Sequence, residues 1–281
     1  MKVVKEINAA IATVSEYKMA GKTIGLVPTM GALHEGHLSL IRHSIHENDI
    51  TAVSIFVNPI QFNSKEDFDN YPITLAQDLE ELEKIGCSLV FVPSKEEMYP
   101  TEPSIKIHFG QLENIMEGLH RSGHFSGVAM VVLKLFHVLA PSRAYFGQKD
   151  LQQYKIIEQM VRDTSLNIEL NMMPIIRNEA GLALSSRNQR LSENGRIIAA
   201  EINKALTIAR QHIAKNESVA QIITKAKNHL ALFPEIEIEY LELVQLKDLS
   251  PVNIITGTNQ LVLCFAGYLE GVRLIDNIII E

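Results

Sequence analysis

Two histidines, His34 and His37, lie three residues apart at the start of a helical pattern and could act on a phosphate group. They follow an apolar, strand-like run that we expect to break at Pro28. A strand that turns into a helix directs backbone N–H groups and the positive end of the helix dipole toward its ligand, which favours an anion. Gly31 and Gly36 allow a ligand close to the backbone, and the imidazoles add hydrogen-bond donors. The segment therefore predicts a phosphate site.

Other interpretations of the two histidines remain open. A histidine at the start of a helix can be a simple cap or a surface residue. A His-x-x-His pair can also bind a metal, but zinc proteases use His-Glu-x-x-His, with the histidines four residues apart. This chain has a spacing of three, with Gly36 between the histidines, which disfavours zinc.

A second polar segment contains Asn58 and Gln61, which follow another strand-like run. Because Pro59 cannot continue a ladder of hydrogen bonds, we expect the strand to stop there and both side chains to project at its carboxyl end. A carboxamide donates and accepts hydrogen bonds, which suits hydroxyls and carboxylates of a small polar substrate. The alternative is a turn asparagine and a surface glutamine.

A third segment, residues 145–154, predicts another strand, turn and helix, with Gly147 at the turn. Lys149 could meet a phosphate as a point charge, and Asp150 could cap the helix or accept a hydrogen bond from a ribose hydroxyl. Gln153 lies one turn into the helix and could point at the same crevice. A capped surface helix is the alternative.

Two polar loops complete the candidate set. In residues 181–188, the run Leu184-Ser185-Ser186-Arg187 places two hydroxyls and a guanidinium together, as a mobile anion clamp would need; an ordinary ST-turn is the alternative. Residues 118–127 are polar and glycine-rich, so they could form a lid whose Arg121 reaches a carboxylate or phosphate. A mobile surface loop is the other interpretation.

The secondary structure expected around these residues follows an alternating pattern. Leu38, Ile41 and Ile45 recur at helical spacing after the two histidines, on a face that would pack onto a sheet. Strand-like runs occur at 24–27, 52–57, 89–92, 144–146 and 168–172, with helical stretches at 74–85, 127–139 and 151–162. This alternation predicts an α/β fold, a Rossmann-like doubly wound parallel sheet that binds ligands at the carboxyl ends of its strands.

The pattern changes in the last third of the chain. Two helical stretches, about 193–214 and 219–232, precede strand-like runs at 237–244, 260–266 and 273–280, with turn-like joins at Gly257 and Gly271. We therefore expect a second, smaller α+β domain. The division predicted is residues 1–175 for the nucleotide- and substrate-binding domain and residues 176–281 for a smaller lid domain.

Composition excludes several classes of protein. The chain has 281 residues, 46 % of them hydrophobic, which can supply a large core. A net charge of −7 disfavours nucleic-acid binding, and no apolar run of 18 residues is present to span a membrane. The amino-terminal residues do not resemble a signal peptide. Cys87 and Cys264 lack metal or redox spacing, so we expect buried free thiols and a cytoplasmic protein.

Four blocks together resemble the pantothenate synthetase (pantoate–β-alanine ligase) family, within the nucleotidyltransferase superfamily that carries a "HIGH" signature. The blocks, in order along the chain, are Pro-Thr-Met-Gly-Ala-Leu-His-Glu-Gly-His from Pro28, Phe-Val-Asn-Pro-Ile-Gln-Phe from Phe56, Gly-Gln-Lys-Asp-Leu-Gln-Gln from Gly147 and Leu-Ser-Ser-Arg-Asn from Leu184. The last block looks like a shortened version of the "KMSKS" loop of adenylate-forming relatives. Each block is weak evidence alone, but four in order are specific.

The resemblance implies an ATP-dependent ligation in two half-reactions: pantoate and ATP give pantoyl adenylate and pyrophosphate, and β-alanine then displaces AMP. It implies that His37, His34 and Lys149 are catalytic, with His37 donating a proton to the departing pyrophosphate. It implies that ATP is bound by Met30, Gly31, Ala32, Leu33, His34, Glu35, Gly36, His37, Gly147, Gln148, Lys149, Asp150, Ile176, Leu184, Ser185, Ser186 and Arg187. Pantoate and β-alanine would be held by Gln61 and Gln153, with Asn58 and Arg121 as further candidates.

The resemblance also implies Mg²⁺ as a cofactor, pantoate, β-alanine and ATP as small-molecule partners, and a homodimer. Asp78 and Glu81 lie near positions tied to Mg²⁺ in the family, although this chain has Gln77-Asp78 where some relatives have two aspartates. Three other functions remain as alternatives: transfer of AMP to a phosphorylated acceptor, a non-catalytic nucleotide sensor, and a metal-binding structural protein.

Overall fold

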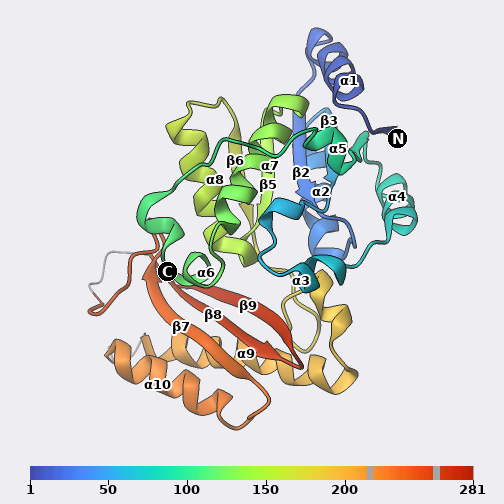
Figure 1. The fold of residues 1–281 in the computed structure, drawn as a ribbon. Coiled ribbons are helices and arrows are strands. Elements are labelled where there is room, and N and C mark those ends of the chain that lie inside the picture. Colours follow the sequence, from blue (N-terminus) through green and yellow to red (C-terminus); the bar gives the residue numbers. More distant parts are fainter. Residues whose placement is uncertain (214–217, 256–259, 281) are drawn as a thin grey trace. The chain divides into compact units, whose positions relative to one another are not determined.

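The computed structural model describes residues 1–213, 218–255 and 260–280 (Figure 1). The chain divides into two compact units. The first contains Met1–Gly147 and Gln152–Pro174, and the second contains Gln148–Leu151 and the residues from Ile175 onward. The short segment Gln148–Leu151 therefore belongs with the carboxyl-terminal part of the chain, although it is flanked in sequence by the first unit.

The first unit is built on a six-stranded parallel sheet in the order β1-β4-β3-β2-β5-β6. The strands are β1 (Lys2–Val4), β2 (Ile24–Thr29), β3 (Ile50–Ile55), β4 (Leu89–Phe91), β5 (Arg143–Gly147) and β6 (Glu169–Met173). From β2 the chain builds the sheet outward through β3 and β4, and then returns to the other side of β2 with β5 and β6. This reversal confirms the predicted doubly wound α/β fold, and its switch point lies between β2 and β5.

Helices cover both faces of this sheet. The helices of the first unit are α1 (Ile7–Met19), α2 (Glu35–Glu47), α3 (Lys65–Asp69), α4 (Leu75–Lys84), α5 (Lys95–Met98), α6 (Met116–His120), α7 (His124–Leu139) and α8 (Leu151–Asp163), with 3₁₀ turns η1 (Pro59–Gln61) and η2 (Gly110–Glu113); a further 3₁₀ turn, η3 (Gln148–Asp150), belongs to the second unit. One hydrophobic cluster joins the sheet to α1, α7 and α8, and another joins it to α2 and α4. Strands buried on both faces explain the continuous apolar runs in the sequence.

The helix after the two histidines packs as its spacing predicts. Ile41 is fully buried against the sheet, and Leu38 and Ile45 pack against the same cluster as Val27 and Val53 of β2 and β3. The polar face of α2 is left outside this cluster. Packing on the sheet therefore fixes the position of α2, and with it the orientation of the amino-terminal end of α2, where His34 and His37 lie.

Pro28 does not end its strand, which corrects the expectation from sequence. It lies inside β2 and pairs in register with Ser54 of β3. The carbonyls of Thr23 and Thr29 accept hydrogen bonds from the β3 side, whereas that of Ile24 accepts one from Ser142 on the β5 side. The backbone of Pro28 therefore faces β5, where pairing with β2 extends only to Leu26. The missing N–H leaves no gap in the ladder, because β5 has already diverged.

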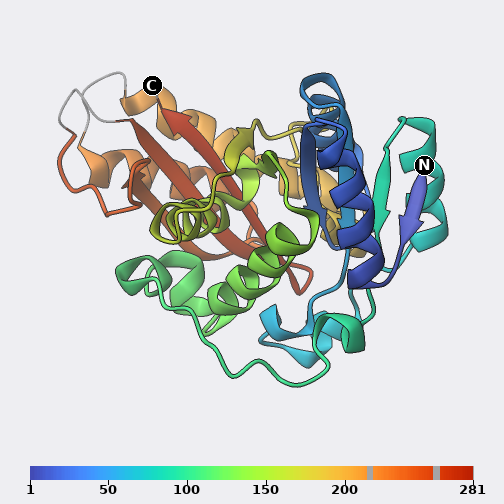
Figure 2. The same cartoon turned by 90° about the horizontal axis from the view of Figure 1, so that it is seen from above.

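The second unit is the predicted smaller α+β domain. Its three antiparallel strands, in the order β7-β8-β9, are β7 (Glu237–Gln245), β8 (Leu261–Leu269) and β9 (Val272–Ile280). The helices α9 (Glu193–Ile213) and α10 (Val219–Leu230) run along one face of the strands (Figure 2) and share a hydrophobic cluster with them, and η4 (Ser186–Arg190) precedes α9. Gly271 joins β8 to β9 with a positive φ of 72°, as its turn role predicts. The predicted join at Gly257 and the predicted end of the first helix at Ala214 lie outside the described residues.

Two further expectations can be compared with the fold. Within the described residues, no helix combines the length and the apolar character needed to cross a membrane. Cys87 and Cys264 are buried free thiols, as expected, and burial raises the pKa of Cys87 to about 11. A thiol held in this state is a packing residue rather than a nucleophile.

Candidate active site

The two histidines form the cap of α2, at the carboxyl end of β2. His34 is the N-cap residue, and its Nδ1 accepts a hydrogen bond from the Gly36 amide at 3.1 Å. The Nδ1 of His37 accepts from the His34 amide at 3.4 Å, and the ring centroids lie 4.0 Å apart. Because each Nδ1 is an acceptor, the proton of each neutral ring lies on Nε2. In this tautomer the Nε2–H of each ring is a hydrogen-bond donor in the neutral form.

The loop that precedes the histidines is held by a carboxylate from a distant helix. Asp78, in α4 and only 2 % exposed, accepts hydrogen bonds from the amides of Ala32 at 2.9 Å and Leu33 at 2.8 Å. It also accepts from the Thr74 hydroxyl at 3.1 Å. Gly31 and Ala32 both have positive φ values, 82° and 49°, which turn successive N–H groups to one side. The loop is thus an anion-binding nest already filled by Asp78.

This arrangement changes the expectation that the loop offers free amides to a phosphate. The Gly31 amide donates to the Thr29 hydroxyl, and the amides of Ala32 and Leu33 donate to Asp78. The Gly36 amide donates to His34. A phosphate bound at this end of the strand would therefore be contacted mainly by side-chain donors.

Asp78 and Glu81 do not fit the magnesium pair that the family resemblance implies. Both oxygens of Asp78 face N–H or O–H donors, whose positive ends would repel a divalent cation at the same oxygens. Glu81, one helical turn further along, pairs instead with Lys84 at 3.1 Å. Among the residues that the structure describes, no cluster of three His, Cys, Asp or Glu side chains could hold a metal ion. We therefore assign no step to a metal bound by these two residues.

The carboxamides of Asn58 and Gln61 lie together, beyond the carboxyl end of β3. Asn58 is 1 % exposed, and its Nδ2 donates to Gln61 Oε1 at 3.0 Å and to the Gly127 carbonyl at 3.1 Å. Gln61 Nε2 in turn contacts the sulfur of Met30 at 3.0 Å. This contact brings the second motif beside the first. The Asn58 carboxamide is therefore used inside the protein, where it orients the Gln61 side chain.

Two residues outside the predicted site complete this network. The Tyr99 hydroxyl donates to Asn58 Oδ1 at 3.0 Å, and His124 Nδ1 donates to the Gln61 carbonyl at 2.7 Å. Burial raises the pKa of Tyr99, so its hydroxyl keeps the proton that it donates. Tyr99 falls outside the segments that the sequence singles out, and His124 lies in the 118–127 loop but is not itself a predicted site residue; only the fold brings the two to Gln61.

Replacing Tyr99 by phenylalanine tests whether this network orients Gln61. The change removes the hydroxyl and leaves Asn58 Oδ1 buried without a donor, which costs about 1–3 kcal/mol of stability. If the loss also loosens Gln61, the KM for the substrate that the family resemblance assigns to Gln61 should rise while the KM for ATP stays constant. Thermal unfolding and initial rates measure the two effects. Tyr17→Phe, at a half-buried tyrosine in α1, is the control; equal kinetics for the two variants would contradict the orienting role.

The remaining candidates in the first unit differ in their surroundings. Two adjacent glutamines, Gln152 and Gln153, lie in α8. Gln152 is buried; its Nε2 donates to the carbonyls of Leu112 and Ile115, and its Oε1 accepts from the Glu117 amide. Gln153 is half-buried, and its contact with substrate remains a prediction. A cavity of about 450 Å³ is lined by Arg121 together with Ile60, Gly127 and residues from 102–108, 113–114, 118, 122–126 and 130.

Arg121 is also paired within its own segment. Its guanidinium lies 3.6 Å from the Glu117 carboxylate, one helical turn earlier. The structure thus brings Arg121 beside Ile60 of η1 and Gly127 in the wall of this cavity. Its assignment to the substrate remains a prediction.

Residues 148–151, which directly follow β5, belong to the second unit. Lys149 and Asp150 form the 3₁₀ turn η3, with the ammonium 4.0 Å from the carboxylate. The turn is held from β9: Asn277 Nδ2 donates to the carbonyls of Gln148 at 2.9 Å and Lys149 at 3.0 Å. Gln148 Nε2 donates back to Asn277 Oδ1 at 3.0 Å. The lysine backbone is therefore fixed by the antiparallel sheet.

The serine-rich loop is anchored by the same strand. Arg177 forms two hydrogen bonds with Asp276 of β9, at 2.6 and 2.8 Å, and a third with the Gly181 carbonyl at 3.1 Å. Burial raises the pKa of Asp276, against the lowering effect of the Arg177 charge. The Leu184 amide donates to the Ile176 carbonyl at 2.9 Å, which closes the loop.

The ST-turn interpretation of the serine run describes its local geometry. Ser185 caps η4, since its hydroxyl accepts a hydrogen bond from the Arg187 amide at 3.3 Å. Ser186 is buried, whereas Arg187 is half-buried. A cap of this kind positions the start of η4 without excluding contact between Arg187 and an anion.

Comparisons with known proteins place this constellation in one family. A family model described as pantoate–β-alanine ligase matches residues 2–279. The pantothenate synthetase of Cytophaga hutchinsonii is 48 % identical over 267 residues, which cover 95 % of this chain and 94 % of that protein. The pantothenate synthetase of Caldicellulosiruptor saccharolyticus is 46 % identical over 282 residues and covers all of both chains.

Solved structures agree with this assignment. The crystal structure of pantothenate synthetase from Thermus thermophilus has a TM-score of 0.92, 38 % identity and 99 % coverage of both chains. The pantoate–β-alanine ligase of Francisella tularensis, complexed with β,γ-ATP and β-alanine, has a TM-score of 0.81, 33 % identity and coverage of 99 % of this chain and 97 % of that one. With its fold, its four motifs and nearly its whole length matched, the chain belongs to the pantoate–β-alanine ligase family.

Proposed function

We propose that this chain joins pantoate and β-alanine into pantothenate through a pantoyl adenylate, with cleavage of ATP to AMP and pyrophosphate. The observation that carries the proposal is the contact between Gln61 and Met30, which brings a neutral carboxamide beside the loop that ends in two imidazole donors. A carboxamide suits a hydroxy acid, whereas an acceptor that carries its own phosphate would need a basic pocket.

In the first half-reaction a pantoate carboxylate oxygen attacks the α-phosphorus of ATP. The new P–O bond gives the mixed anhydride, and the bond to the bridging oxygen of pyrophosphate breaks. Both reactants are anions, so the site must hold them together and stabilise the charge that moves onto the leaving group. Alignment of such reactants supplies roughly 7–11 kcal/mol of the barrier. No protein nucleophile is needed.

The first unit would supply the donors for this step. The Nε2–H groups of His34 and His37 would contact the phosphates, and His37 would give its proton to the departing pyrophosphate. The acceptor bonds at both Nδ1 atoms support this assignment, because they set the tautomer that a donor requires. Gln61 and Gln153 would bind pantoate, with Asn58 holding Gln61 in place.

The second unit would supply further nucleotide contacts. Lys149 would lie against a phosphate and Asp150 against the ribose. Since the Ile176 carbonyl already accepts from Leu184, its amide is the group we assign to adenine. Residues 184–187 would close over the phosphates, and residues 176–281 as a whole would act as the lid domain.

In the second half-reaction the neutral amine of β-alanine attacks the activated carbonyl carbon. The C–N bond forms, the bond to the AMP oxygen breaks, and the amine loses a proton. Gln61 would also contact β-alanine, because its carboxamide lies beside the site assigned to pantoate.

We further propose a cytoplasmic homodimer that uses ATP with Mg²⁺, as the family resemblance implies. The free buried thiols are consistent with a reducing compartment.

Release of pyrophosphate from purified protein with ATP and Mg²⁺ tests the proposal before any β-alanine is added. With pantoate we expect a stoichiometric burst, because the adenylate stays bound, and without pantoate we expect none. Addition of β-alanine should convert the burst into continuous turnover. Pantoate-independent release, or AMP transfer to a phosphorylated acceptor instead, would contradict the proposed reaction, and ATP binding without any release would indicate a nucleotide sensor.

A further inference from the structure

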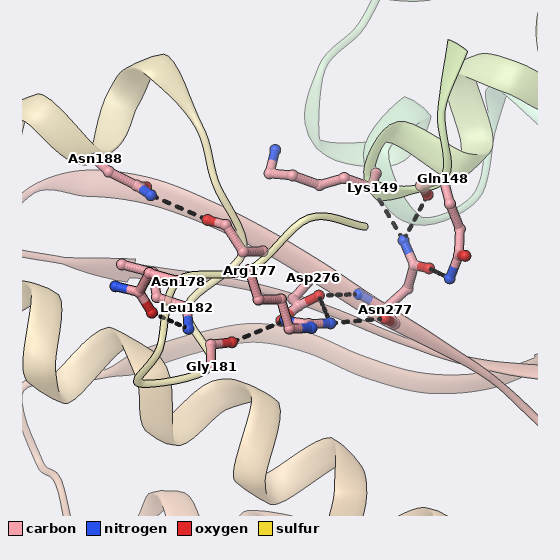
Figure 3. Close-up of polar contacts among 10 residues, drawn as sticks. Gln148, Lys149, Arg177, Asn178, Gly181, Leu182, Asn188, Asp276 and Asn277 are labelled. Atoms are coloured by element: carbon pink, nitrogen blue, oxygen red, sulfur yellow. Dashed lines mark hydrogen bonds and ion pairs between the residues drawn. The ribbon is translucent and has the colours of Figure 1, made fainter. Parts of the chain in front are cut away.

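We propose that the dipeptide Asp276-Asn277 of β9 is a positioning device for the nucleotide, because it holds both segments of the second unit that we assign to ATP (Figure 3). One segment is the turn that carries Lys149, and the other is the loop that leads from Arg177 to residues 184–187. This inference rests on the proposed function, which makes these segments nucleotide contacts. It adds two residues that none of the four motifs contains.

Asn277 fixes the lysine turn through three hydrogen bonds. It is 3 % exposed, so its carboxamide works in a site with little competition from water. Its Nδ2 donates to two successive backbone carbonyls, of Gln148 and Lys149, while its Oδ1 accepts from the side-chain Nε2 of Gln148. Figure 3 shows the side chain of Asn277 directed at the turn, with the Lys149 side chain extending away from it. Only a carboxamide supplies two donors and one acceptor in this geometry.

Asp276 fixes the loop through Arg177. The carboxylate accepts two hydrogen bonds from the guanidinium in a bidentate pair, and the same guanidinium reaches the Gly181 carbonyl and, at 3.4 Å, the Asn277 carbonyl. An antiparallel backbone bridge pairs Arg177 with Ala183, which lies two residues before Ser185. The pair between Arg177 and Asp276 therefore also positions the serine run, residues 184–187. Bidentate pairs of this type fix direction as well as distance.

The position of the two residues on the strand explains how one element can hold both segments. Successive side chains of a strand point to opposite faces. Asp276 can therefore contact Arg177 while Asn277 contacts the lysine turn. The lysine turn η3 is only three residues long and cannot hold its own position by helical hydrogen bonds. Its distance from the loop is therefore set by β9, which is itself paired along its whole length with β8.

The test replaces Asn277 in two ways. Asn277→Leu keeps the approximate volume but removes all three hydrogen bonds, and Asn277→Asp keeps the size but turns a carboxylate toward two carbonyls. Both variants should raise the KM for ATP and lower single-turnover adenylate formation by roughly 10- to 100-fold, since a 1 Å misplacement can cost about 10²-fold. The KM for β-alanine in the second half-reaction should not change.

Glu239→Gln is the matched control, because it weakens a half-buried ion pair with Arg273 on the same sheet, and neither of these residues belongs to either segment. Thermal unfolding of all three variants identifies any general loss of stability. If Asn277→Leu unfolds, Asn277→Asp provides the kinetic comparison at unchanged side-chain size. If both Asn277 variants behave like Glu239→Gln in the ATP parameters, the inference is overturned.

A double-mutant cycle with Lys149→Met separates this inference from the proposed function. If Asn277 acts through Lys149, Asn277→Leu should add little to the loss already caused by Lys149→Met. Additive losses would mean that Asn277 acts on general stability instead. If Lys149→Met leaves ATP binding and adenylate formation unchanged, it is the assignment of Lys149 to the nucleotide that fails.

Discussion

Replacing His37 by alanine should lower the rate of pantoyl-adenylate formation by about 10²–10³-fold, the usual loss when one preorganised donor to a developing charge is removed. The ring presents its Nε2–H because Nδ1 accepts from the His34 amide. The change leaves the His34 cap in place, so the fold should persist with a loss of about 1 kcal/mol at most from the end of the helix. Single-turnover release of pyrophosphate measures the rate, and thermal unfolding measures the stability.

Two further variants sharpen this prediction. His37→Gln keeps an N–H donor near the position of Nε2 but cannot transfer its proton. It should recover part of the rate if a hydrogen bond alone stabilises the leaving group, and none of it if proton transfer is required. His43→Ala, at an exposed histidine of the same helix, is the control. A normal rate of pyrophosphate release from His37→Ala would exclude His37 from the chemistry.

Replacing Asp78 by asparagine should lower both stability and activity. An amide can accept through only one of its atoms, so one of the Ala32 and Leu33 amides would face an NH₂ group in a buried site. The loss is about 1–3 kcal/mol in the free energy of unfolding. Because the loop positions His34 and His37, a displacement of about 1 Å should lower adenylate formation by about 10²-fold. Chemical denaturation and single-turnover kinetics measure the two effects.

Glu80→Gln, two residues along the same helix, is the control, since Glu80 is exposed and pairs with Lys84 at 2.7 Å. A titration with Mg²⁺ distinguishes the two roles of Asp78. If the carboxylate held the cation, excess Mg²⁺ would restore activity in Asp78→Asn; if it holds the loop, excess Mg²⁺ would have no effect. Stability and activity equal to those of Glu80→Gln would contradict the structural role.

Local features of the sequence were sufficient to predict the fold class. The apolar runs around 24–27 and 52–57 and the helical spacing of Leu38, Ile41 and Ile45 are properties of neighbouring residues, and the sheet and α2 followed them. The same holds for the smaller domain, where two helices and three strands appear in the predicted order. Short or weakly amphipathic elements such as β1 and α1 gave no comparable signal.

The error at Pro28 shows where local reasoning fails. Proline removes a donor, but the effect of that loss depends on which neighbouring strand the missing N–H would have faced. The sequence cannot show that β5 diverges after Leu26. The same limit applied to the loop amides, since Asp78 lies 46 residues from Ala32 in sequence.

The order of residue types along the chain was enough to predict the chemistry available to this protein: which residues donate, accept and carry charge, and the family to which their order belongs. Which of those groups are already occupied became visible only in the folded chain. The side chains of Asn58 and Asp78 form hydrogen bonds within the protein, and Asn277 donates to the backbone carbonyl of Lys149, 128 residues away in sequence. Hydrogen bonds in a buried site depend on distance and direction, and both are set by packing between elements far apart in the chain.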